Sequence, residues 1–98
     1  MMNLTIPTTA TVTVTTSATP VQGASAAIPP GVEVLVRAHP DNTGTITVAN
    51  SSATALNTTG TCERLLAHQT ITYQVQNTNQ LWFDATVSGE KVLLTYML

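Results

Sequence analysis

The chain has 98 residues, the length of a single domain. Charged side chains make up only 8% of it, against about 25% in an ordinary soluble domain, and three of them are Lys or Arg. So few basic residues argue against direct nucleic-acid binding, and no apolar run approaches the roughly 20 residues of a membrane-spanning helix. Weak charge repulsion between surfaces favours association with other polypeptides.

The N-terminal part of the chain is rich in threonine and has no charged residue before Glu33. Thr and Val alternate over residues 11–15, a pattern that favours extended backbone. Such a segment is too polar to form a core alone and too uncharged to behave as an ordinary disordered tail. We therefore expect residues 1–28 to form an extended arm. Part of it, residues 18–28, is expected to add an edge strand to the domain that follows.

The backbone of this arm predicts its role. An extended segment offers its N–H and C=O groups to any strand that lies beside it. We expect the arm to pair with a neighbouring polypeptide, and we assign this contact to Thr11, Val12, Thr13 and Val14.

Residues 29–98 show the period-two alternation of β-strands without a competing helical period. Turn-forming residues separate the runs, with a predicted hairpin turn at residues 40–44 and a tight connection at 77–79. Residues 62–68 fit either a strand or one helical turn. Short strands at this spacing predict an all-β fold, an antiparallel β-sandwich or jelly-roll-like domain. The predicted strands cover residues 32–38, 46–48, 71–75, 81–87 and 92–98.

The same alternation predicts which large apolar side chains face outward. Leu81 and Phe83 share the inward face of their strand, which places Trp82 on the opposite face. Parity also directs Leu35 and Leu93 outward. Exposed large apolar groups in a domain of low charge mark a contact surface. For Trp82 the alternative is that the arm or a loop of its own chain covers it.

No set of residues predicts catalysis, a metal site or a cofactor. His39 and Asp41 are close in sequence, but they flank a proline, and turn formation explains them better than metal binding. Cys62 and His68 lack the third group and the Gly-rich loop that accompany a catalytic nucleophile. Cys62 is the only cysteine, so no disulfide forms within the chain. We expect neither an enzyme nor a bound cofactor.

Two groups of turn and strand signatures carry a resemblance to a known class of protein. The first is Pro-Gly-Val-Glu-Val at residues 30–34, followed by Ala-His-Pro-Asp-Asn-Thr-Gly-Thr-Ile-Thr-Val at 38–48. The second is Leu-Trp-Phe at 81–83, followed by Ser-Gly-Glu-Lys-Val at 88–92 and by Tyr96. With these, about two-thirds of the chain resembles small virion proteins of tailed bacteriophages. The Thr-rich arm departs from that pattern.

This resemblance implies a β-sandwich on the phage particle, often as a head decoration (cement) protein. We therefore expect a protein made in the host cytoplasm that binds the major capsid protein on the outer surface of the head. We expect it to act as a homotrimer, without a membrane or direct nucleic-acid partner. One alternative is a tail-fibre or receptor-binding module that stacks carbohydrate on Trp82 or Tyr73. Another is a different structural protein of the head or tail, such as a connector or tail-tube protein.

Overall fold

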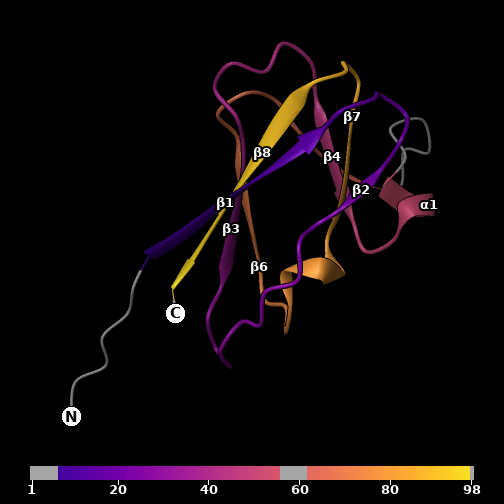
Figure 1. The fold of residues 1–98 in the computed structure, drawn as a ribbon. Helices are drawn as coiled ribbons and strands as arrows, with labels where there is room; N and C mark the ends of the chain where they lie inside the picture. The colour runs from indigo at the N-terminus through magenta and orange to yellow at the C-terminus, as the bar shows by residue number, and fades with distance from the viewer. Residues whose placement is uncertain (1–6, 56–61, 98) are drawn as a thin grey trace.

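The computed structural model describes residues 7–55 and 62–97 and contains two four-stranded antiparallel sheets (Figure 1). A short helix, α1 (Ser52–Ala55), follows β4, and a 3₁₀ turn, η1 (Thr78–Gln80), precedes β7. The predicted all-β antiparallel sandwich is confirmed. Sheet A has the order β1 (Pro7–Val14), β8 (Glu90–Met97), β3 (Val34–Ala38) and β6 (Thr70–Tyr73). Sheet B has the order β2 (Val21–Gln22), β7 (Trp82–Ala85), β4 (Ile46–Ala49) and β5 (Glu63–Leu65).

Consecutive strands mostly lie in different sheets. Among the described strands, only β4 and β5 follow one another within the same sheet. The turn at residues 40–44 is therefore not the hairpin turn that we predicted, because it takes the chain from β3 in sheet A to β4 in sheet B. Residues 86–89 likewise lead from β7 to β8. Each sheet thus combines strands that are far apart in sequence.

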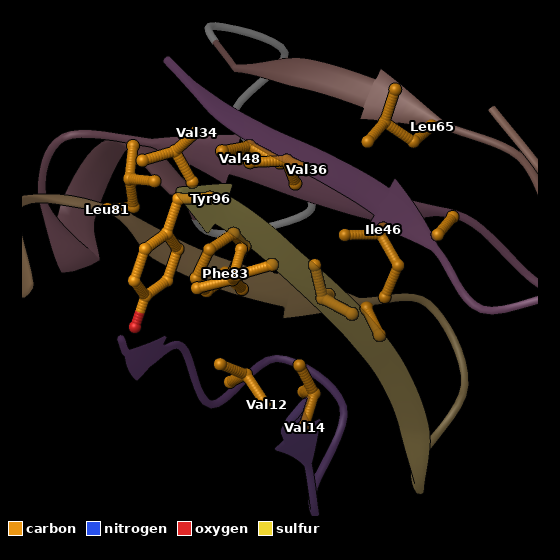
Figure 2. Packing of buried hydrophobic residues seen from close by; sticks show 14 of the residues in the cluster. Val12, Val14, Val34, Val36, Ile46, Val48, Leu65, Leu81, Phe83 and Tyr96 are labelled. Atoms are coloured by element: carbon orange, nitrogen blue, oxygen red, sulfur yellow. The ribbon is translucent and has the colours of Figure 1, made fainter. Parts of the chain in front are cut away.

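Alternate residues of the strands point between the two sheets and form one hydrophobic core (Figure 2). Phe83, Ile46 and Leu94 are its largest fully buried side chains, and valines fill much of the remainder, since branched side chains pack well on a pleated sheet. The predicted inward face of Leu81, Phe83 and Ala85 is confirmed. Val87 does not continue it and is 42% exposed, because the strand ends at Ala85.

Residues 7–14 belong to the sandwich and do not form a separate arm. β1 pairs with β8 over eight residues, from Pro7 opposite Met97 to Val14 opposite Glu90. Val14 is fully buried and Val12 is 8% exposed, and Figure 2 shows both side chains within the core. The alternation that predicts extended backbone also creates one apolar face, and the core of the same chain buries it. The predicted boundary between an arm at 1–28 and a domain at 29–98 is thus not seen, and residues 1–6 lie outside the described part.

The rest of the expected arm is bound by the turn before β7. β2 pairs with β7 in sheet B, which confirms an edge strand within residues 18–28. The Gly23 N–H donates to the Leu81 carbonyl at 2.9 Å, and the Thr78 N–H donates to the Ala26 carbonyl at 3.1 Å. A Cβ at position 23 would lie 2.4 Å from the Thr78 carbonyl oxygen, so the approach requires glycine.

Residues 62–68, for which the sequence left two possibilities, contain the strand β5 followed by a turn. His68 in this turn has φ 73°, the left-handed region that side chains with a Cβ disfavour. Its N–H donates to the Ala38 carbonyl at 3.1 Å, which ties the turn to the end of β3.

Glu90 joins the turn after β3 to the start of β8. The residue is 6% exposed, and its carboxylate accepts the backbone N–H groups of Thr43 at 2.8 Å and Gly44 at 2.7 Å. The Asn42 side chain bonds both the C=O and the N–H of Lys91, at 2.8 and 3.0 Å. Hydrogen bonds to an ionised group are stronger than neutral ones. The Asp-Asn-Thr-Gly and Gly-Glu-Lys-Val signatures therefore form one structural unit.

Candidate contact surface

The solvent-facing side of sheet A is the candidate contact surface, and we call it the outer face. The strand register places on it the odd-numbered residues of β1, β3 and β8 and the even-numbered residues of β6. None of these side chains is buried, whereas their neighbours point into the core. Apart from Pro7 at the end of β1, the outer face comprises Thr9, Thr11, Thr13, Leu35, Arg37, Thr70, Thr72, Lys91, Leu93, Thr95 and Met97.

Leucine side chains occupy the middle of the outer face. Leu93 lies opposite Thr11 on one side and opposite Arg37 on the other, and Leu35 lies opposite Thr95. Both leucines are half-buried between these neighbours. The prediction that they face outward is confirmed, while their role in a contact stays a prediction. Met97 at the end of β8 is 40% exposed and extends the apolar area; we did not predict it, although the parity that directs Leu93 outward applies to it as well.

The charges on the outer face are all positive. Arg37 and Lys91 are its only charged side chains, and both are exposed. The other four exposed charges are those of Glu33, Asp41, Glu63 and Arg64. The two remaining carboxylates, those of Asp84 and Glu90, are buried. Three exposed cations therefore balance three exposed anions, and the solvent-facing charge is zero although the chain has a net charge of −2.

The four β1 residues that we assigned to a contact divide between the two faces of sheet A. Thr11 and Thr13 are exposed on the outer face. Val12 and Val14 lie in the core and cannot touch a partner in this fold. β1 is an edge strand, so one of its two backbone edges faces away from β8.

Trp82 lies on the opposite side of the molecule. It projects from the outer side of sheet B, where it is half-buried opposite Gln22 on β2 and Ala49 on β4. The helix α1 covers part of this side, and its residue Ala55 accepts a hydrogen bond from the buried Thr47 hydroxyl. Trp82 therefore does not share a surface with Leu35 or Leu93.

An open pocket of about 380 Å³ lies beside Tyr73, near the ends of β4 and β6. Burial, with smaller electrostatic contributions from Glu63 and Cys62, raises the pKa of the Tyr73 phenol above its ordinary value of 10.0. A second pocket of about 230 Å³ shares residues 74–76 with the first and is otherwise lined by residues 28–32. Every residue that lines the first pocket is uncharged: Ala49, Asn50, Tyr73, Gln74, Val75, Gln76, Gln80 and Leu81.

Within residues 7–55 and 62–97, no three His, Cys, Asp or Glu side chains gather as metal ligands would. His39 Nδ1 instead accepts the Asp41 backbone N–H at 3.0 Å, as expected for a turn. Cys62 is half-buried, and His68 is exposed in the turn after β5. Of the helices in the described part of the chain, none has the length and apolar character to cross a membrane.

Comparison with protein-family models, curated proteins and solved structures gives no match. The resemblance to small phage virion proteins therefore remains an expectation that rests on the signature residues.

Proposed function

We propose that the protein is a decoration protein of a tailed-bacteriophage head, and that it binds the outer surface of the shell and bridges neighbouring major capsid protein subunits. The observation that carries the proposal is the outer face of sheet A, with two leucines and a methionine among threonines and only two charges. The virion setting comes from the signature residues.

The chemistry of the outer face defines the surface that it fits. Burying Leu35, Leu93 and Met97 releases water from apolar area, which stabilises a complex by about 25 cal/mol per Å² of that area. Threonines carry no charge that must be desolvated on contact. Arg37 and Lys91 meet no carboxylate on their own face, so a partner with acidic groups around an apolar patch is complementary. Each contact is modest, and repetition over the shell supplies the total strength.

The partner-binding segment differs from the one that the sequence predicted. Residues 7–14 and 21–22 pair within their own sandwich, so the outer face, which includes Thr9, Thr11 and Thr13, makes the proposed contact in place of a free arm. The resemblance implies a homotrimer, which at three-fold or quasi-three-fold positions would present three outer faces to the shell; the pairing of β1 edges proposed below gives a dimer instead. The mass of the free protein in solution tests this part separately.

Binding to shells tests the proposal. Heads assembled without the protein are mixed with purified protein and sedimented, and bound copies are counted and located by labelling. Leu93→Glu places a charge at the centre of the outer face and is expected to weaken binding by about tenfold or more, equivalent to about 1.4 kcal/mol. Thr15→Glu is the matched control, because residue 15 is exposed in the loop after β1. Both variants must unfold at the wild-type temperature.

Two results would contradict the proposal. Equal binding of Leu93→Glu and wild type would remove the outer face as the contact. Label confined to one vertex or to the tail would favour a connector or tail protein.

The pocket beside Tyr73 supports carbohydrate recognition as a second candidate function. Its volume falls in the range of small-molecule sites, about 300–1,000 Å³, and primary amides with an aromatic ring suit a neutral sugar. Trp82, the other candidate for sugar stacking, does not line it. A glycan array separates the two functions. A decoration protein binds no glycan, whereas binding that Gln74→Ala abolishes and Thr15→Glu preserves would support a receptor-binding module.

A further inference from the structure

β1 differs from the other three edge strands of the sandwich. Exposed edges invite pairing with other chains, and proteins limit this by keeping edge strands short or charged. β2 has two residues and β6 has four, and β5 has three residues that include Glu63 and Arg64. β1 has eight residues and no charge. Among the edge strands of the described part of the chain, β1 is the one that is neither short nor charged.

The backbone of β1 between residues 9 and 13 has ladder hydrogen bonds to β8 and, within the described chain, no other backbone or side-chain partner. In an antiparallel pair, alternate residues direct their N–H and C=O groups away from the partner strand. This stretch therefore presents backbone donors and acceptors in a row on the side away from β8. Its outer-face side chains are Thr9, Thr11 and Thr13, all exposed.

We propose that β1 pairs edge to edge with β1 of a second copy of this chain, antiparallel about a two-fold axis at Thr11. A continuous sheet requires that residues with the same facing lie opposite each other. The register centred on Thr11 satisfies this, because it sets Thr9 opposite the partner's Thr13 and Ala10 opposite the partner's Val12. It also leaves Pro7, which lacks an N–H, outside the paired stretch.

Self-pairing suits this edge better than a charged partner strand. Threonines facing one another across strands form favourable pairs, and like charges directly opposite would be destabilising. No charge lies at the seam, and the nearest one in the ladder is Lys91, which is opposite Thr13 on the next strand. The pairing would extend sheet A across both copies and place their two outer faces side by side. It does not depend on what the outer face binds.

A disulfide test measures the register directly. In a Cys62→Ser background, Thr11→Cys places two thiols opposite each other, with Cα atoms about 4.5–5.5 Å apart, which is within disulfide range. Mild oxidation with oxidised glutathione is expected to give a covalent dimer. Thr72→Cys, exposed on the outer face of β6, is the matched control and is expected to stay monomeric on a denaturing gel. A mixture of Thr9→Cys and Thr13→Cys proteins is expected to form the mixed dimer.

Sedimentation measures the same contact without cysteines. The wild type is expected to form dimers, whereas Thr11→Lys, which sets two ammonium groups against each other, is expected to be monomeric with an unchanged fold. Thr72→Lys is expected to keep the wild-type mass.

Three outcomes would overturn the pairing: equal crosslinking of the position-11 and position-72 cysteines, a wild type that stays monomeric, or a trimer that the position-11 cysteine does not crosslink. The last outcome would leave the decoration proposal intact. Crosslinking without any binding to heads would overturn the decoration proposal alone.

Discussion

Val14→Ala tests whether the N-terminal segment is part of the folded domain. The Val14 side chain is fully buried, and the change removes the equivalent of two buried methylene groups. At about 0.8 kcal/mol for each, the transfer term alone lowers the free energy of unfolding by about 1.6 kcal/mol. The cavity that remains raises the loss to about 2–3 kcal/mol. Thr13→Ala is the matched control, because the Thr13 side chain, next to Val14 in β1, is exposed. Substitutions at the surface usually change the free energy of unfolding by no more than about 0.5 kcal/mol.

Thermal and urea unfolding, followed by circular dichroism, measure both variants. In a domain of this size, 1 kcal/mol shifts the melting temperature by about 4–8 °C, so Val14→Ala is expected to melt at least 8 °C below wild type. The slope of the urea transition should stay the same, since the core remains intact. If Val14→Ala and Thr13→Ala melted together, β1 would not contribute its valines to the core, and the pairing of β1 with β8 would be refuted.

Three further predictions concern a turn, a strained residue and a partly buried phenol. Glu90→Ala leaves two backbone N–H groups without their carboxylate acceptor, and each hydrogen bond to a charged group is worth about 1.5–3 kcal/mol. Urea unfolding should therefore show that the free energy of unfolding falls by about 3 kcal/mol or more, and by less in Glu90→Gln. Equal losses in the two variants would contradict the role of the charge. His68→Gly removes a cost of about 1–2 kcal/mol for the left-handed backbone conformation and adds a cost of about 0.5–1 kcal/mol in conformational entropy on folding, so the melting temperature should rise slightly. Ala67→Gly is the control and should lower the melting temperature. A lower melting temperature for His68→Gly would refute the strain at residue 68. The raised pKa of Tyr73 means that the folded state favours the neutral phenol, so stability is complete below the ordinary pKa of 10.0 and falls as pH rises above it. Melting curves from pH 8 to 11 should therefore show Tyr73→Phe gaining relative to wild type above pH 10, and a constant difference would show that burial does not shift this group.

Period-two alternation was sufficient to predict the fold class and the facing of most side chains. Leu35 and Leu93 face outward for the reason that parity gives, and Phe83 and Ala85 face inward. Alternation does not define to which sheet a strand belongs. That is why the turn at residues 40–44 looked like a hairpin turn, although it joins strands of different sheets.

The same limit explains why the sequence grouped contact residues that the structure separates. Parity separates inside from outside, so it placed Trp82 outward with the two leucines, but it could not show that Trp82 belongs to the other sheet. Thr–Val alternation in residues 11–14 predicted a strand with one apolar face without defining whose core would bury that face. The bonds from Glu90 to the turn near residue 43 join positions about half the chain apart, and no local pattern indicates them.

The absence of charge from the first 32 residues still needs a physical reason once β1 is placed in the sandwich. The core requires apolar side chains only at alternate positions of β1, such as Val12 and Val14. The exposed positions 9, 11 and 13 face solvent, where a Lys or Glu would cost the fold little and would protect the edge from pairing. Strand propensity explains why threonine suits these positions, but it does not exclude a charge from every one of them. A strand whose outer side chains and backbone edge meet another surface does explain the absence of charge, because each charge there would have to be desolvated or would face its own copy.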